Sequence, residues 1–143
     1  MIQYRIVKSQ FADLSGAGAK EFGGRWNPRG LPALYTTEGV ALAVCENLVH
    51  MGVKHLPKNR VLLRIEVPDE EVSTAYESFD FGKDDSVAEG ESWLHSQDSL
   101  CIKVPSIIMP YSFNYVINTE HPGFQDVKLR DVIPFDFDRR FFT

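Results

Sequence analysis

Cysteine and long apolar runs are scarce in this sequence of 143 residues, and both absences narrow the possibilities. The two cysteines, Cys45 and Cys101, form no CxxC pair, so two free thiols are expected, with a single disulfide as the alternative. No segment approaches the roughly 18 consecutive apolar residues of a membrane span, and no secretion signal is visible at the N-terminus. We therefore expect a cytoplasmic protein without a membrane partner.

An excess of basic residues is absent as well. Asp and Glu outnumber Lys and Arg by 20 to 15, which gives a net charge of −5. Surfaces that bind nucleic acid generally carry a basic excess, so direct contact with nucleic acid is not expected. An anionic ligand would have to be met by a few placed cations.

The common cofactor and metal motifs are missing. Gly16 and Gly18 are followed by Glu21 where a dinucleotide-binding turn would need its third glycine, and no helix pattern follows. The four histidines show neither HExxH nor paired-ligand spacing. They are His50, His55, His95 and His121. Neither a permanently bound cofactor nor a metal ion is therefore expected.

The composition is that of one globular domain spanning 1–143, with 43% hydrophobic and 24% charged residues. Alternating and periodic apolar positions predict strands and two helices, with an irregular, functional Gly-rich segment over 15–30. The strands are expected over 2–7, 34–36, 60–67, 101–104, 107–109, 113–117 and 127–133. The helices are expected from a Thr37 cap to Met51 and over 86–96. This order predicts an α+β fold with a curved, mostly antiparallel sheet and a few helices.

Four polar residues are conspicuous in this pattern: Arg25, Tyr35, Glu46 and Ser106. Glu46 lies on a helix that is apolar around most of its circumference, which we therefore expect to be buried on most of its surface. Each residue also has an ordinary interpretation, respectively as a surface cation, a core tyrosine, the solvent-facing position of its helix and a turn hydroxyl.

The order of short motifs along the chain resembles the RES-domain family, which is named for an Arg, a Glu and a Ser. The matching segments are Tyr4-Arg5-Ile6, Gly24-Arg25-Trp26-Asn27, Leu34-Tyr35-Thr36, Glu46 with Leu48-Val49-His50, Val104-Pro105-Ser106, Asn114-Tyr115, Asn118 with His121-Pro122, Pro134-Phe135 and Asp138-Arg139. The resemblance covers nearly the whole chain except about 79–96. It implies an ADP-ribosyltransferase-like fold, degradation of NAD as a substrate, and a toxin paired with an Xre-type helix-turn-helix antitoxin.

The resemblance also implies a role for each site residue. Arg25 would clamp the pyrophosphate, because a guanidinium matches phosphate oxygens bidentately, and Tyr35 would stack on nicotinamide or its ribose. Asn27 and Asn118 are further NAD-binding candidates. No ribose 2′-hydroxyl contact can be assigned, so NAD and NADP are not distinguished.

The implied catalytic residues are Arg25, Tyr35, Glu46 and Ser106. Among them, Glu46 would stabilise the oxocarbenium-like ribose as the nicotinamide bond breaks. Ser106 would hold the carboxamide or the glutamate in place, with Ser112 as the alternative site serine. The acceptor of the ribosyl group stays open between water and phosphate.

Three other functions remain at this point. The same site could transfer ADP-ribose to a cellular protein, or the domain could be catalytically silent and only bind its antitoxin. An RNase is disfavoured because no general acid–base pair and no basic surface are visible. A homodimer within a toxin–antitoxin complex, through exposed Phe141 and Phe142, also stays open.

Overall fold

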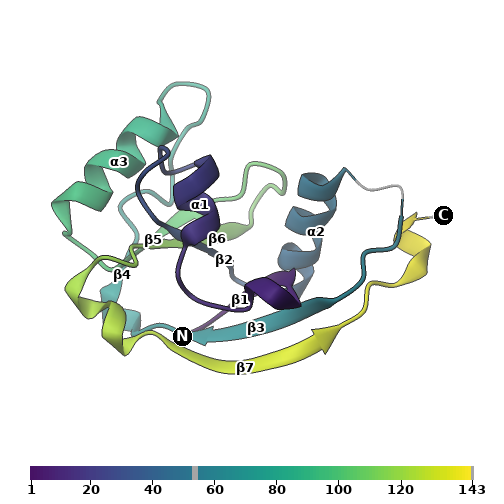
Figure 1. The fold of residues 1–143 in the computed structure, drawn as a ribbon. Helices are drawn as coiled ribbons and strands as arrows, with labels where there is room; N and C mark the ends of the chain where they lie inside the picture. Colours follow the sequence, from purple (N-terminus) through teal and green to yellow (C-terminus); the bar gives the residue numbers. More distant parts are fainter. Residues whose placement is uncertain (53–54, 143) are drawn as a thin grey trace.

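The computed structural model describes residues 1–52 and 55–142. Its centre is a seven-stranded sheet in the order β4-β5-β6-β2-β1-β3-β7 (Figure 1). All neighbouring strands pair antiparallel except β4 and β5, which are parallel. This confirms the predicted α+β fold with a curved, mostly antiparallel sheet.

The elements follow the alternation and helical periodicity of the sequence closely. The strands are β1 (Ile2–Lys8), β2 (Leu34–Thr37), β3 (Arg60–Glu66), β4 (Val72–Ser73), β5 (Cys101–Pro105), β6 (Phe113–Ile117) and β7 (Lys128–Phe135). The α-helices are α1 (Ala17–Phe22), α2 (Val40–Met51) and α3 (Ser86–Ser96). Among the described residues no helix has the length and apolar character that crossing a membrane requires.

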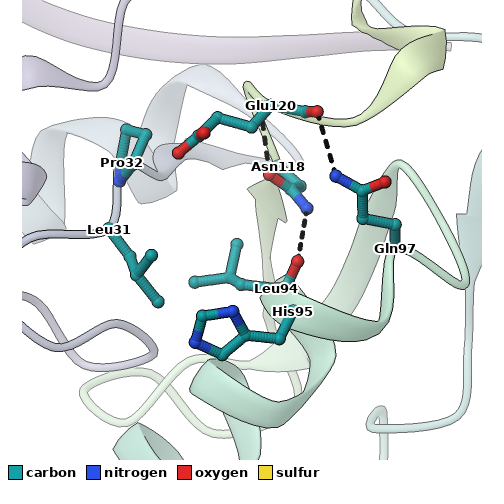
Figure 2. A pocket seen from close by; sticks show the side chains of 7 residues that line it. All are labelled: Leu31, Pro32, Leu94, His95, Gln97, Asn118 and Glu120. Atoms are coloured by element: carbon teal, nitrogen blue, oxygen red, sulfur yellow. Dashed lines mark hydrogen bonds between the residues drawn. The ribbon is translucent and has the colours of Figure 1, made fainter.

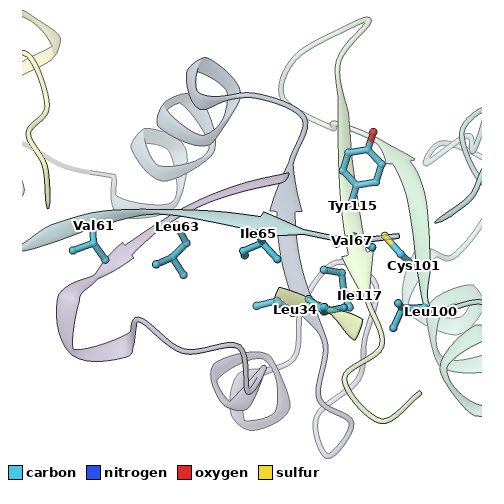
Figure 3. Packing of buried hydrophobic residues seen from close by; sticks show 10 residues of the cluster. Leu34, Val61, Leu63, Ile65, Val67, Leu100, Cys101, Tyr115 and Ile117 are labelled. Carbon is cyan, nitrogen blue, oxygen red and sulfur yellow. The ribbon is translucent and has the colours of Figure 1, made fainter. Parts of the chain in front are cut away.

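The two faces of the sheet are covered differently. One face carries a single continuous apolar cluster, which Figure 3 shows. Its buried members are Leu34, Val61, Leu63, Ile65, Val67, Leu100, Cys101, Tyr115, Ile117 and Val127. The N-terminal segment packs against this cluster through Val7, Ala12 and Leu14.

The other face carries two apolar clusters. Trp93 and Leu94 of α3 pack over β5 and β6, whereas Ala43 of α2 packs with Ile6 and Leu62 over β1 and β3. The strands β6 and β2 lie next to each other in the middle of the sheet order, between these two groups. Figure 1 shows α3 and α2 standing apart on the same side of the sheet. Polar side chains can therefore reach the sheet between them.

Two local predictions are wrong. The segment 15–30 is not irregular throughout, because Ala17–Phe22 forms α1 between Gly16 and Gly23, both with positive φ. A Cβ at Gly16 would lie 2.9 Å from the carbonyl oxygen of Ala33, so this tight entry requires glycine. The expected strand over 107–109 is instead a turn, described with the site below.

The ends and burial of α2 also differ from expectation. β2 continues through Thr37, and the N-cap of α2 is Gly39, which provides no side-chain cap. Only Leu42 and Ala43 of this helix are fully buried, and Val49 is 61% exposed. The helix 86–96 is confirmed and is capped by Asp85, whose carboxylate accepts hydrogen bonds from two backbone N–H groups.

The prediction of free thiols is confirmed, whereas the prediction of exposed C-terminal aromatics holds for only one of the two. Cys45 and Cys101 are both free, as predicted. Phe142 is not a free surface group, because it packs against the α2 cluster next to Phe137, whereas Phe141 is 57% exposed.

Candidate active site

Glu46 projects from α2 towards the connection between β5 and β6 and is half-buried. Its Oε1 accepts hydrogen bonds from Ser106 Oγ at 3.0 Å and from Asn114 Nδ2 at 2.7 Å. No group in 1–52 or 55–142 donates a hydrogen bond to the second oxygen, Oε2. The carboxylate is therefore anchored through one oxygen, and the other can accept a hydrogen bond from a ligand.

Ser106 is oriented by the turn that follows β5. Its hydroxyl accepts hydrogen bonds from the N–H groups of Ile108 at 3.3 Å and Met109 at 3.1 Å, which folds 107–109 into a turn. A hydroxyl has one proton, so this proton is directed to Glu46. Ser112 contributes its backbone carbonyl to the Ser106 N–H at 2.8 Å. The structure thus brings Ser106 to Glu46, and Ser112 supports the turn.

Tyr35 connects β2 to the loop that contains Arg25. Its hydroxyl accepts a hydrogen bond from the Trp26 N–H at 2.9 Å and donates one to Asn27 Oδ1 at 2.5 Å. Burial raises the pKa of Tyr35 to about 12, against smaller opposing effects of the Trp26 hydrogen bond and the Arg25 charge. Near neutral pH the hydroxyl therefore stays protonated, and it keeps both hydrogen bonds to the Arg25 loop.

The Arg25 loop is fixed from its other side by α3. Ser86 Oγ donates a hydrogen bond to the Arg25 carbonyl at 2.6 Å. Gly90 lies so close that a Cβ there would be 1.8 Å from the Trp26 carbonyl oxygen. The backbone of Arg25 is thus held firmly while its side chain is exposed. A cation on a fixed loop suits an anionic ligand.

Asn27 is 1% exposed and its amide is used within the loop. Its Nδ2 donates to the carbonyls of Ala19 at 2.8 Å, Pro28 at 3.1 Å and Leu31 at 2.9 Å. Its oxygen accepts the Tyr35 hydroxyl, so the side chain shapes the Arg25 loop. Direct contact between Asn27 and NAD stays a prediction.

Asn118 directly follows the C-terminal end of β6, whereas Asn114 is near the start of that strand. It is 2% exposed, its Nδ2 donates to the Leu94 carbonyl at 3.1 Å, and its Oδ1 accepts from the Glu120 N–H at 3.0 Å. It lines a cavity of about 110 Å³ together with Leu94, His95 and Glu120 (Figure 2). The structure does not bring Asn118 together with Glu46 by any described contact, and its role in NAD binding stays a prediction.

Two cavities in the described part of the chain lie away from Glu46. The cavity at Asn118 and a second one of about 310 Å³ beside Tyr76 and Trp93 contain none of the four predicted site residues. We place the candidate active site at Glu46 because two donors converge there on a carboxylate with a free oxygen, whereas neither hollow contains a comparable group.

Asn114 is a site residue to which the sequence interpretation assigned no role. In the sheet it pairs with Thr37 of β2 and Val104 of β5, and it shares a face with Val116. That face carries the α2 and α3 clusters. A polar residue on the covered face of a strand is unusual, and this was the available signal.

The fold and the site around this carboxylate define a class of protein. It is a small α+β protein in which a glutamate on a helix lies over the middle of a curved sheet. Residues 2–138 match the sequence profile of the RES domain. The chain belongs to the RES domain family of toxins, as the motif order predicted.

Relatives of known name agree with this membership. The Prs ADP-ribosylating toxin of Sphingobium sp. is 39% identical over 139 residues, which cover 90% of this chain and 86% of the relative. The protein Toxin Res of Pseudomonas putida is 35% identical, with 99% of this chain and 100% of the relative covered.

A solved structure shares the fold. A chain of the M. tuberculosis MbcT–MbcA toxin–antitoxin complex superposes with a TM-score of 0.71 at 22% sequence identity. The match covers 99% of this chain and 86% of that chain.

Proposed function

We propose that this protein is the toxin of a toxin–antitoxin pair and that it degrades NAD by breaking the nicotinamide–ribose bond at Glu46. The observation that carries the proposal is the geometry of the carboxylate, in which Oε1 is anchored by Ser106 and Asn114 while Oε2 accepts no hydrogen bond from the described residues. The family membership and the names of the relatives support the same class of chemistry.

The reaction begins with cleavage of the C–N bond between the ribose and the nicotinamide ring. The electron pair of that bond leaves with nicotinamide, which becomes neutral, and positive charge develops on the ribose carbon and ring oxygen. Glu46 Oε2 accepts a hydrogen bond from a ribose hydroxyl, and the carboxylate stabilises the developing cation. Nicotinamide leaves uncharged, so the step needs no general acid.

A nucleophile then completes the reaction at the ribose carbon. Attack by water forms the new C–O bond and releases a proton, giving ADP-ribose. Attack by inorganic phosphate forms the same kind of bond and gives ADP-ribose carrying a phosphate. In both cases the role of Glu46 is the same, and only the nucleophile differs.

Arg25 and Tyr35 bind the substrate in this proposal. The exposed guanidinium of Arg25 forms charge-assisted hydrogen bonds to the pyrophosphate. The Tyr35 hydroxyl is engaged by Trp26 and Asn27, so its half-buried ring is the part that contacts nicotinamide or ribose. Asn27 supports this loop, and Asn118 is a further candidate for contact with NAD.

Transfer of ADP-ribose to a cellular protein is the second candidate. A specific observation favours it, namely the 39% identity to a relative named as an ADP-ribosylating toxin. The same Glu46 chemistry serves both reactions, and only the acceptor differs. In either case we propose an Xre-type antitoxin as the protein partner; the toxin–antitoxin complex with the shared fold supports an antitoxin partner as such.

The test is to induce the wild-type chain and a Glu46→Gln variant at matched expression and to measure intracellular NAD. Glutamine keeps an acceptor for Ser106 and Asn114 but removes the negative charge. NAD should fall steeply with the wild type only, with free or phosphorylated ADP-ribose accumulating. Labelled protein without loss of the NAD pool would favour the second candidate, and growth arrest with neither change would overturn both.

A further inference from the structure

Asn114 occupies a position in the interior of the sheet where an amide is costly. Its strand, β6, is paired on both sides, with Thr37 opposite on β2 and Val104 opposite on β5. Its Nδ2 donates to Glu46 Oε1 at 2.7 Å, and its Oδ1 is buried without a hydrogen-bond partner in the described part of the chain. An unpaired buried carbonyl oxygen destabilises the folded state.

The orientation of the amide explains why this cost is tolerated. Rotating the amide by half a turn would give Oδ1 another environment, but it would direct that oxygen at the Glu46 carboxylate, and two acceptors repel each other. The Glu46 carboxylate therefore determines which way the Asn114 amide is rotated. Val116 is the next residue on the same face, and it belongs to the apolar cluster under α3.

We propose that Asn114 is a positioning residue for Glu46, an inference that rests on the proposed role of Glu46 in the reaction. The amide and the Ser106 hydroxyl hold the same carboxylate oxygen from two directions, which fixes the rotation of the carboxylate. Oε2 is thereby kept facing the substrate.

The two donors to Glu46, Ser106 and Asn114, lie on different kinds of structure. Ser106 is held by a turn on the connection between β5 and β6, whereas Asn114 is carried by a strand that is hydrogen-bonded on both sides. Groups on regular elements hold a catalytic geometry more precisely than groups on loops. Asn114 is therefore the rigid reference for the position of Glu46.

The first test is Asn114→Leu, which keeps the number and branching of the side-chain heavy atoms and removes both polar atoms. We expect kcat for NAD to fall by about 10- to 100-fold, as for a small misplacement of a catalytic group, with little change in KM. The melting temperature should stay the same or rise, because the unpaired oxygen is gone. A purely structural asparagine would give the opposite result, with lower stability and unchanged kcat.

The second test is Asn114→Asp, whose readout is the pH dependence of kcat. The new carboxyl faces Glu46, so repulsion raises its pKa, and only its protonated form can donate a hydrogen bond to Glu46. We expect activity to recover as the pH falls, because the new carboxyl, once protonated, restores the donor to Glu46 Oε1. The wild type should show no such recovery at low pH.

A matched control is Asn47→Asp, on the residue after Glu46 in α2. The Asn47 amide donates to the carbonyls of Ile6 at 3.2 Å and Ala43 at 2.9 Å and does not touch the carboxylate. Per folded molecule, this variant should keep the pH dependence of the wild type.

The outcomes separate the two proposals. If the wild type consumes NAD and Glu46→Gln does not, but Asn114→Leu keeps its kcat and Asn114→Asp shows no recovery at low pH, the role of Asn114 is overturned alone. If the wild type consumes no NAD, the proposed function is overturned together with this inference.

Discussion

Two asparagines lie four residues apart on and just after β6 and use their amides in opposite ways. Asn118 satisfies both ends of its amide, on the Leu94 carbonyl and the Glu120 N–H. Asn114 donates to Glu46, and its buried oxygen has no hydrogen-bond partner among residues 1–52 and 55–142. A buried amide with every hydrogen bond satisfied ties the fold together, whereas one that is left incomplete indicates a site that uses it.

Replacing Asn118 should give the largest change in stability. Asn118→Leu leaves the Leu94 carbonyl and the Glu120 N–H without their partner, so we expect a loss of about 2–4 kcal/mol in the free energy of unfolding. Urea denaturation measures it, and kcat per folded molecule should be unchanged. An intact stability with a higher KM for NAD would instead support direct binding by Asn118 and would remove the contrast with Asn114.

Arg25→Ala tests a residue that we expect to bind the substrate without contributing to the stability of the fold. The side chain is exposed, so stability should be unaffected, but loss of charge-assisted hydrogen bonds to the pyrophosphate should raise KM for NAD by about 10- to 100-fold. Arg29→Ala, another exposed arginine in the same loop, is the control and should leave KM near the wild-type value. Equal effects of the two variants would show that only overall charge matters.

Tyr35→Phe tests whether the Arg25 loop needs its tie to β2. The change leaves the Trp26 N–H and Asn27 Oδ1 unsatisfied, and we expect a loss of about 1–3 kcal/mol in stability. KM for NAD should also rise, because Arg25 is less well fixed. Tyr111→Phe, at a side chain that is 99% exposed, should change neither quantity. A Tyr35→Phe protein with wild-type stability and KM would exclude this role for the hydroxyl.

The smallest expected effect concerns the face of the sheet away from Glu46. Burial raises the pKa of Cys101 to about 12, so the folded state keeps the thiol protonated at pH values where the unfolded chain has lost the proton. The stabilising contribution is complete below the ordinary thiol pKa and is lost as the pH rises from there to about 12. Between pH 8 and pH 10 the free energy of unfolding should fall by roughly 1–2 kcal/mol from this group.

Cys101→Ala should remove that part of the decline with pH. Urea denaturation at pH 8 and pH 10 measures it for the wild type and the variant together. Parallel declines in the two proteins would show that the thiol does not contribute.

The sequence predicted the sheet well because strand alternation is a local signal. The roles of Arg25, Tyr35, Glu46 and Ser106 came from the order of family motifs and stay predictions, although the structure does bring Ser106 to Glu46. The contact of Asn114 with Glu46 could not be predicted, because it depends on the pairing of β6 with two strands distant in sequence and on the position of α2.

Two local errors have physical causes. The segment 107–109 is apolar like a strand, but the Ser106 hydroxyl captures two of its N–H groups. The six residues of α1 were not recognised as a helix because the flanking glycines are typical of a loop. In the structure these glycines adopt the positive φ angles at the two ends of the helix.

The most direct measurement of the central claim is nicotinamide release from NAD by the purified chain, with wild type and Glu46→Gln compared at equal folded concentration. We predict steady release by the wild type and a rate at least about 100-fold lower for the variant, because the cation-stabilising charge is lost while Ser106 and Asn114 keep their acceptor. Equal rates in the two proteins, or no release by the wild type, would contradict the assignment of the reaction to Glu46.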